Sequence, residues 1–275
     1  MTNCNRRDEN LFQWPISTAT GPAHFAAKRV GFLGPHGTFT EEALRVAMAR
    51  GPEAVVDDIE LVPYASIEDT IQAVTGGEVD CALVPIENSI EGSVSVTVDV
   101  LAWESHGVQI IREVRLPIRH RLITRPGVRF EEISQIISHP HANSQCRRWL
   151  RRNKPGVPVV AANSTAGAVE IVSQSSEPWA AIGTAIAAEQ YGCVIMRDNI
   201  EDHDDNETRF VFLSLVRERQ DFPEPYKTSV VCEIMKDQPG ALLLILQEFA
   251  HRYINLTKVE SRPSKRRLGD YIFLV

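Results

Sequence analysis

Short apolar segments alternate with segments of helical periodicity along most of this chain, and this alternation restricts the possible folds more than any other feature. In the first series the pattern predicts strands at 30–33, 59–64 and 81–86, separated by helices at 38–50 and 66–74. Strands that alternate with helices favour a largely parallel sheet covered on both faces. The chain is therefore expected to adopt an α/β fold.

A second series of the same kind follows and predicts a second lobe. The apolar run at 210–216 indicates a buried strand that rejoins the first series. We expect lobe one to hold 29–105 plus 208–218, and lobe two to hold 106–207, with ligands collecting in a cleft at the carboxyl ends of the strands. In the second series the pattern predicts strands at 108–111, 120–124, 136–138, 157–161, 179–182 and 194–196, and helices at 142–152, 165–173 and 184–191.

The two ends of the chain differ from this central region. Residues 1–28 show no clear period and are predicted to be a disordered extension. The stretch 219–227, with two prolines, is predicted to be a linker. Beyond it, 228–275 shows a strand, a helix and two strands, which is the beginning of a ferredoxin-like βαββαβ unit. We expect this C-terminal α+β domain to be truncated before its second helix and last strand.

Composition excludes several classes of function. The net charge of −7 offers no broad basic field for a nucleic acid. The five cysteines are scattered and never spaced C-x-x-C, which predicts neither a disulfide framework nor a metal site. No apolar run approaches the roughly 20 residues of a membrane span, and no secretory signal is recognisable. A cytoplasmic protein without a membrane or nucleic-acid partner is expected.

One short stretch, Asn206–Phe210, carries residues suited to chemistry. Thr208 can donate a hydrogen bond to a leaving oxygen, and Arg209 can hold a carboxylate with two parallel charge-assisted bonds. Side by side at the entrance of a strand, they suit an anionic substrate that loses a group. The alternative is that this pair only ties a loop down.

Four polar loops fall at expected strand ends, where a cleft would lie. The glycines of 34–38 precede a helix N-terminus, which is a natural anion site, although a plain turn also explains them. Glu87–Ser89 could supply a catalytic carboxyl or a helix cap. In 138–143 the histidines could move protons or be structural. Residues 163–165 form an N-cap whose helix N-terminus could also face a ligand.

Together these loops resemble the motifs of prephenate dehydratase. The motifs are GPHGTFTEEA (34–43), PIENSIEGSV (85–94), SHPHANSQC (138–146), STAGA (164–168) and NETRF (206–210). The C-terminal segment resembles the ACT domain of the same family through PGAL (239–242) and ESRP (260–263). In the third motif the family carries Gln where this chain has His141, and Leu where it has Asn143.

The resemblance implies conversion of prephenate to phenylpyruvate, water and carbon dioxide, without a metal or cofactor. It implies a two-lobed catalytic region similar to periplasmic binding proteins, allosteric control by phenylalanine, and a homo-oligomer (a dimer or a tetramer) formed through paired ACT segments. The implied catalytic residues are Thr208 as donor to the leaving hydroxyl, Arg209, and Glu87 as an alternative proton source. The implied substrate-binding residues are Thr38, Asn88, Ser89, Gly92, Ser164, Thr165, Asn206 and Phe210, and the implied phenylalanine-binding residues are Pro239, Gly240, Ala241, Leu242, Glu260, Ser261, Arg262 and Pro263.

Two alternatives stay open at this point. An arogenate dehydratase would run the same elimination on the amino analogue of prephenate. A non-catalytic solute-binding or amino-acid-sensing protein would also have two α/β lobes around a cleft.

Overall fold

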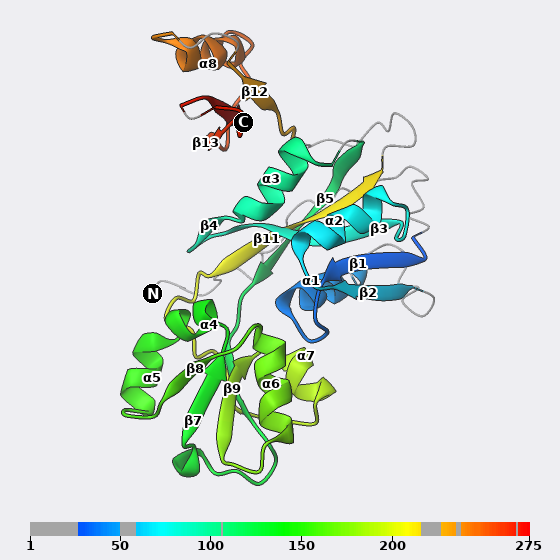
Figure 1. Cartoon of the computed structure of the whole chain (residues 1–275). Helices are drawn as coiled ribbons and strands as arrows, with labels where there is room; N and C mark the ends of the chain where they lie inside the picture. Colours follow the sequence, from blue (N-terminus) through cyan, green and yellow to red (C-terminus); the bar gives the residue numbers. More distant parts are fainter. Residues whose placement is uncertain (1–26, 50–58, 106, 216–226, 235–237, 268) are drawn as a thin grey trace, which may run out of the picture. The chain divides into compact units, whose positions relative to one another are not determined.

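The computed structural model describes residues 27–49, 59–105, 107–215, 227–234, 238–267 and 269–275 (Figure 1). The chain divides into an N-terminal unit, Phe25–Glu218, and a second unit that contains Arg219–Val275, called here the C-terminal unit. The disordered extension expected at 1–28 and the linker expected at 219–227 lie almost entirely outside the described residues. The predicted α/β class is confirmed by the N-terminal unit, in which two sheets form two lobes.

The sheet of lobe one has the order β2-β1-β3-β11-β5, with β4 paired to β3. Its parallel pairs join β1 to β2 and to β3, whereas β11 is antiparallel to both β3 and β5. The sheet is therefore mixed rather than largely parallel, because β11 returns from the other lobe against the direction of β3. Its strands are β1 (Arg29–Leu33), β2 (Glu60–Tyr64), β3 (Cys81–Asn88), β4 (Gly92–Ser93), β5 (Val108–Pro117) and β11 (Glu207–Leu215).

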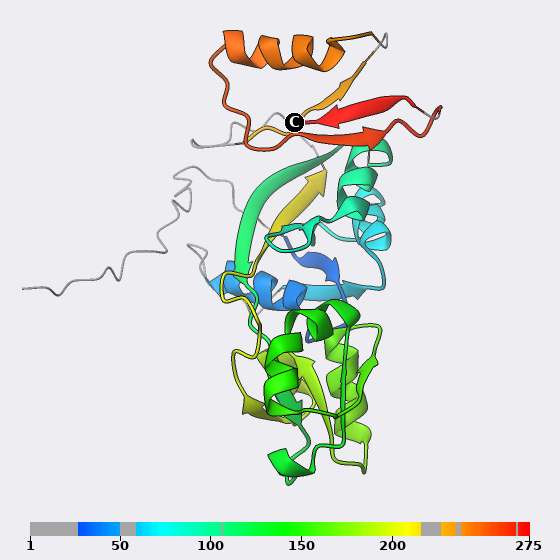
Figure 2. The same ribbon diagram turned by 90° about the vertical axis from the view of Figure 1, so that its left-hand side faces the viewer.

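The predicted boundary between the lobes at residue 106 is wrong. The strand expected at 108–111 is the ten-residue β5, and it pairs with β11 along nearly its whole length (Figure 2). Lobe one therefore contains β5 as well. The chain crosses into lobe two after Pro117 and returns before Glu207, and the backbone N–H of Ile118 donates to the carbonyl of Asn206 at 2.8 Å between the two crossing segments.

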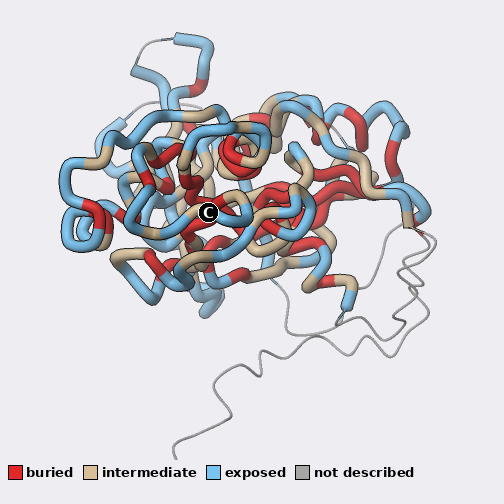
Figure 3. Tube along the Cα trace, turned by 90° about the horizontal axis from the view of Figure 1, so that it is seen from below, coloured by how far each residue is buried: buried red, intermediate tan, exposed pale blue. Residues whose placement is uncertain are grey.

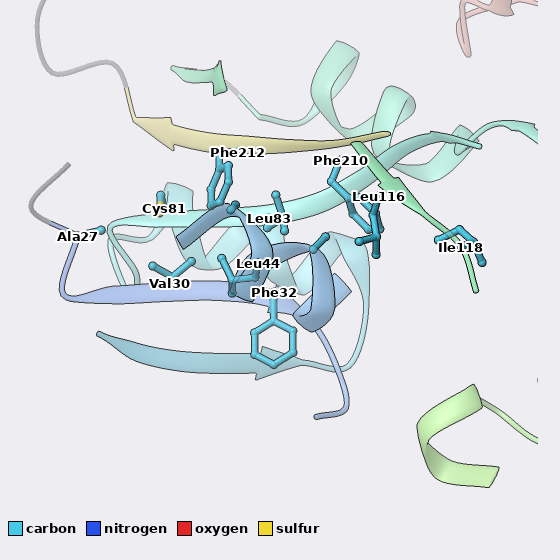
Figure 4. Close-up of a cluster of buried hydrophobic side chains, with 12 residues drawn as sticks. Ala27, Val30, Phe32, Leu44, Cys81, Leu83, Leu116, Ile118, Phe210 and Phe212 are labelled. Carbon is cyan, nitrogen blue, oxygen red and sulfur yellow. The ribbon is translucent and has the colours of Figure 1, made fainter. Parts of the chain in front are cut away.

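Helices cover both faces of the first sheet. Helix α1 (Phe39–Ala49) packs Leu44 against Phe32, Leu83, Phe210 and Phe212 (Figure 4). The other face packs Val211 and Leu213 against α2 (Ile67–Thr75) and α3 (Ser95–Trp103). Ser66 caps α2, since its hydroxyl accepts from the backbone N–H of Asp69. Buried residues concentrate in the central strands β1, β3 and β11, whereas β2 at the edge of the sheet has none (Figure 3).

Lobe two is built on a sheet of order β10-β6-β9-β7-β8. The single helix expected at 142–152 is two helices, because the backbone at Cys146 leaves the helical region with φ −110° and ψ 10°. Its strands are β6 (Arg121–Thr124), β7 (Gln135–Ser138), β8 (Val159–Ala161), β9 (Trp179–Gly183) and β10 (Val194–Arg197), and its helices are η1 (Phe130–Glu132), α4 (Pro140–Gln145), α5 (Arg147–Asn153), α6 (Thr165–Gln174) and α7 (Ala185–Gln190).

The C-terminal unit contains β12 (Val231–Glu233), α8 (Ala241–His251), β13 (Glu260–Pro263) and β14 (Tyr271–Leu274). Strand β14 lies between β12 and β13 and is antiparallel to both. This arrangement agrees with the ferredoxin-like order that the sequence predicted. Helix α8 has no buried residue, and Leu243 and Leu244 are more than half exposed.

Candidate active site

The amide group of Asn88 lies at the centre of the candidate site. Asn88 ends β3 and is paired in register with Thr208 of β11. Its Nδ2 donates to Oγ1 of Thr208 at 2.9 Å and to Oδ1 of Asn206 at 2.8 Å. Its Oδ1 accepts from the backbone N–H groups of Ile90 and Glu91, both at 2.9 Å. Because these backbone groups can only donate, the Asn88 amide can face Thr208 only with its nitrogen.

This orientation decides what the Thr208 hydroxyl can do. A hydroxyl has one proton to donate and lone pairs that accept. One lone pair of Oγ1 is taken by Asn88, and among the described residues no acceptor is found for the proton of Thr208. The residue is 9% exposed. The hydroxyl of Thr208 can therefore still donate a hydrogen bond.

Three further residues extend this cluster away from Thr208. Asn206, 1% exposed, donates from Nδ2 to Oε1 of Gln145 at 2.9 Å. The same Oε1 lies 2.9 Å from Nε2 of His120. Burial lowers the pKa of His120, and the contacts with Gln145 and Glu201 offset this only in part. We call Asn88, Gln145, Asn206 and Thr208 the amide cluster.

Sequence reasoning did not select Gln145 or His120. Gln145 stands inside the motif SHPHANSQC, so its position in the motif was the available signal. His120 belongs to none of the motifs, and its only signal is an imidazole at the start of the strand expected at 120–124. Neither signal indicates that the two side chains meet.

Arg209 lies on the opposite face of β11 from Thr208, because successive side chains of a strand alternate. Its guanidinium is ion-paired with Glu87 and lies 3.6 Å from a carboxylate oxygen of Glu113. The register of β3 and β11 places Arg209 opposite Glu87. Arg209 therefore does not lie beside the Thr208 hydroxyl. Phe210 is 2% exposed and packs in the core of lobe one.

Ser89 and Gly92 shape the turn that follows Asn88. The Ser89 hydroxyl accepts from the backbone N–H of Glu207 at 2.9 Å and lies 3.2 Å from the carbonyl of Asp205, to which it donates. Gly92 has φ +83°, a conformation that a side chain disfavours, and pairs with Asn88 through β4. These residues tie the turn to the entrance of β11.

The glycine loop and the STAGA motif meet each other. Gly37 has φ +84°, and a Cβ there would lie 3.0 Å from the Cβ of Ala187 and 3.4 Å from that of Ala166, so any other residue would be strained. The Thr38 hydroxyl donates to the carbonyl of Leu33, and Ser164 accepts from the backbone N–H of Gly167. Thr165 begins α6. Among the described residues, no hydrogen bond links Thr38, Ser164 or Thr165 to the amide cluster.

The side chain of Glu41 fixes the glycine loop, residues 34–38. Its carboxylate, 1% exposed, accepts from the backbone N–H of Gly37 at 2.7 Å and from the guanidinium of Arg45. Burial acts to raise the pKa of Glu41, but these hydrogen bonds and the nearby charges hold the pKa below its usual value. The loop is therefore fixed by a buried, ionised carboxylate.

A pocket of about 500 Å³ lies elsewhere in lobe two, against α4, α5 and residues 154–159. Arg147, Arg151 and Lys154 line it, and none of the predicted site residues does. Asn143, where the family carries Leu, also lines it, and its Nδ2 donates to the carbonyls of Ser138 and Val160. The exposed His141 takes no part in the amide cluster. Its ring packs edge-on against His139, its backbone N–H donates to Nδ1 of His139, and its carbonyl accepts from the Ser144 hydroxyl.

In the C-terminal unit, the two predicted phenylalanine-binding motifs lie at the start of α8 and on β13. Gly240, with φ +86°, precedes α8, and Pro239, Ala241 and Leu242 flank it. Glu260 and Arg262 are ion-paired on β13, next to Ser261 and Pro263. No hydrogen bond joins the two motifs within the described ranges.

Two absences hold for the described residues. No group of three or more His, Cys, Asp or Glu side chains there could hold a metal ion. None of the helices in those ranges combines the length and the apolar character that crossing a bilayer requires.

Comparison with known proteins points to one family. A family model described as prephenate dehydratase matches residues 30–218. The prephenate dehydratase of Methanocaldococcus jannaschii is 42% identical over 249 residues, which are 90% of this chain and 87% of that protein. The structure of prephenate dehydratase from Arthrobacter aurescens in complex with L-Phe has a TM-score of 0.78 and 39% identity, and the match covers 90% of this chain and 79% of that chain.

A further solved structure carries a different description. GqqA, described as a novel type of quorum quenching acylase, has a TM-score of 0.75 and 29% identity, and the match covers 90% of this chain and 85% of that chain. A shared fold does not fix the reaction, so function has to be argued from the site. The resemblance predicted from the five motifs is nevertheless confirmed.

Proposed function

This chain belongs to the prephenate dehydratase family, and from that membership and the site geometry we propose that it converts prephenate to phenylpyruvate, water and carbon dioxide. The class of enzyme is then a carbon–oxygen lyase. The observation that carries the proposal is the Thr208 hydroxyl, whose oxygen accepts from Asn88 and whose proton remains to be given.

The reaction needs a donor at one atom. The bond between the ring carbon and its hydroxyl oxygen breaks, while the bond to the ring carboxylate breaks and its electron pair enters the ring. Carbon dioxide leaves, and the departing oxygen becomes water after it takes up a proton. Aromatisation supplies the driving force. The protein has to orient prephenate, exclude water and stabilise the leaving oxygen.

Thr208 is proposed to donate to that leaving oxygen. The pKa of a threonine hydroxyl is too high for a free acid, so its role is a hydrogen bond aimed at developing charge. One well-placed donor contributes about 10²- to 10³-fold to turnover. Asn206 and Asn88 hold Thr208, and Ser89 and Gly92 shape the adjoining turn.

Contacts to the carboxylates of prephenate are a further part of the proposal. Thr38, Ser164 and Thr165 stand at helix N-termini, which favour anions. A contact from Arg209 would require the substrate to compete with Glu87 and Glu113 for its guanidinium. Glu87, which would serve as a proton source only when protonated, is engaged in the same pair.

We further propose that phenylalanine regulates the enzyme through the C-terminal unit. Support comes from the motifs at 239–242 and 260–263, and from the relative whose structure holds L-Phe. Binding between paired copies of this unit would make the protein a homo-oligomer. Titration calorimetry with phenylalanine should give a saturable heat, and phenylalanine should raise the unfolding temperature and lower turnover. No heat and no inhibition would refute this regulation.

The activity is tested by ultraviolet absorbance of phenylpyruvate with purified protein. Prephenate should be turned over faster than arogenate, and an acylase assay should give no product. Faster turnover of arogenate would identify the rival dehydratase. Acylase activity without phenylpyruvate formation would overturn the proposal.

A further inference from the structure

We propose that the pocket of lobe two binds a small organic anion, namely a carboxylate with an apolar body and no ammonium group. The pocket, called here the lobe-two pocket, has a volume of about 500 Å³, and small-molecule sites usually span about 300–1,000 Å³. No member of the amide cluster lines it, so this binding goes beyond the proposed reaction.

The walls of the lobe-two pocket are largely apolar. Ile136 of β7, Leu150 of α5, and Val157 and Val159 at the entrance to β8 line it. Val159 is exposed, although it stands in a strand of the sheet, because β8 is the edge strand. An apolar body seated against these side chains would remove their surface from water, which favours binding.

Two guanidinium groups supply the charge. Arg147 and Arg151 are four positions apart on α5, so they lie on one face of that helix, and both line the pocket. Neither forms an ion pair within the described part of the chain, whereas Arg45, Arg119 and Arg209 each pair with a carboxylate. Like charges at this spacing repel each other. A bound carboxylate could accept from both guanidinium groups and relieve that repulsion.

The third cation of the pocket is already engaged. Nζ of Lys154 donates to the carbonyl of Phe130 and lies 4.2 Å from the centre of the Phe130 ring. The charge available to a ligand therefore comes from the two arginines of α5.

The same lining argues against an ammonium group on the ligand. Among the described residues that line the pocket, none is an aspartate or a glutamate. Oδ1 of Asn143 has no hydrogen-bond partner in the described ranges, but it is buried from solvent and offers no neutralising acceptor. An ammonium group would thus meet cations without a carboxylate to offset them. The pocket should discriminate against amino acids and accept their analogues without the amino group.

The alternative is that the arginines of α5 only solvate an exposed helix. Arg148 and Arg152 represent that alternative, because they have the same spacing on the same helix, are also exposed, and do not line the pocket. The two pairs of arginines therefore form a matched set.

The probe for the binding experiment is hydrocinnamate, which is phenylalanine without its ammonium group. Nuclear magnetic resonance of methyl groups follows Leu150 and Val157, which line the pocket. Their signals should shift saturably as hydrocinnamate is added. Signals that do not shift would overturn the proposal.

The first comparison uses two double variants that remove the same charge from the same helix. In Arg147→Gln with Arg151→Gln, the Kd for hydrocinnamate should rise about 10-fold or more, because two charge-assisted donors are lost. In Arg148→Gln with Arg152→Gln, the Kd should change less than about 2-fold, since distant exposed charges are screened by salt. An equal rise in both double variants would mean that only the general charge of α5 matters, and would overturn the site.

The second comparison changes the ligand and keeps the wild-type protein. Phenylalanine adds the ammonium group, and hydrocinnamamide replaces the carboxylate by an uncharged amide. Each should shift the signals of Leu150 and Val157 with a Kd about 10-fold or more above that of hydrocinnamate. Equal binding of phenylalanine or of hydrocinnamamide would overturn the assigned chemistry. Inorganic phosphate that binds as tightly as hydrocinnamate would overturn the role of the apolar walls.

These measurements report binding and not turnover. Selective binding of hydrocinnamate by a protein that turns over no prephenate would refute the proposed function alone. Turnover of prephenate without any shift at Leu150 and Val157 would refute the lobe-two pocket alone.

Discussion

The two faces of β11 at its entrance differ in chemistry. On the face that packs on α1, Thr208 contacts neutral amides, with Asn88 and Asn206 as partners. On the face that packs on α2 and α3, Arg209 contacts the carboxylates of Glu87 and Glu113. One strand thus separates a polar but uncharged cluster from a set of ion pairs, although the two residues are neighbours in the chain.

This difference indicates what each face contributes. Neutral amides can fix the direction of a hydroxyl without placing a charge beside it, and the hydroxyl stays available as a donor. The half-buried ion pairs of Arg209 with Glu87 and Glu113 join neighbouring strands, and their charges already have partners within the protein. The uncharged face therefore suits an elimination that needs one aimed donor, and the charged face suits the support of β3 against β11.

The largest effect is expected at Thr208. Thr208→Val keeps the branched shape and removes the hydroxyl, so kcat should fall about 10²- to 10³-fold while the unfolding temperature changes little. Thr208→Ser, which keeps the donor, should retain much of the activity. Phenylpyruvate absorbance and thermal unfolding measure both effects. Turnover by Thr208→Val near that of the wild type would remove the hydroxyl from the mechanism.

A smaller effect, and of a different kind, is expected at Arg209. Arg209→Met leaves Glu87 and Glu113 without their shared cation, and should cost about 1–2 kcal/mol of the free energy of unfolding, since these side chains are about a quarter exposed. Glu87→Gln in the same chain should recover part of it. Denaturant unfolding measures the loss. A large rise in the KM for prephenate with unchanged stability would show instead that Arg209 binds a substrate carboxylate.

The sequence predicted which residues belong to the site better than it predicted where their side chains point. Asn88, Asn206 and Thr208 stand in motifs, and the structure brings them together. Thr208 and Arg209 were expected to act side by side, yet the two-residue period of a strand already sends them to opposite faces. His120 could not be found in this way, because its contact with Gln145 joins positions that are 25 residues apart.

For the fold, too, local sequence patterns predicted some features and missed others. The alternation of apolar and helical segments gave the α/β class and the order of most elements. The ten-residue β5 was expected as four residues, because its first part alone is an apolar run and the charged Arg112, Glu113 and Arg115 interrupt the rest. The ion pair of Glu113 with Arg209 and the pairing with strand β11 are long-range contacts, which local patterns cannot supply.

Ser89 offers a test of the turn that follows Asn88. Ser89→Ala removes the bonds to Glu207 and Asp205 while leaving the backbone pairing of Ser89 with Glu207. It should cost about 1 kcal/mol of unfolding free energy and lower kcat only a few-fold. Denaturant unfolding and the phenylpyruvate assay check this. A loss of kcat as large as that of Thr208→Val would mean that Ser89 itself contacts the substrate.

The smallest expected effect is a dependence of the free energy of unfolding on pH. It arises at His120, which contacts Gln145 at the end of the amide cluster away from Thr208. Burial lowers the pKa of His120, with Arg121 acting in the same direction and Glu201 against it. Below the ordinary histidine pKa of about 6.5, the unfolded chain takes up a proton that the folded chain does not, so the free energy of unfolding falls. The contribution is complete above that pH and lost progressively as the pH falls toward the folded pKa.

Comparison with His120→Gln isolates this contribution, because glutamine keeps the donor and does not titrate. The difference in unfolding free energy between the wild type and His120→Gln should stay constant above about pH 7 and shift against the wild type on acidification, since only the wild type gains a titrating imidazole on unfolding. Urea unfolding at a series of pH values measures it. A difference that shifts in favour of the wild type on acidification would mean that the folded state binds the proton more tightly. The imidazole would then be the charged form, and the hydrogen-bonded cluster of Asn88, Asn206 and Gln145 would carry a cation at its end.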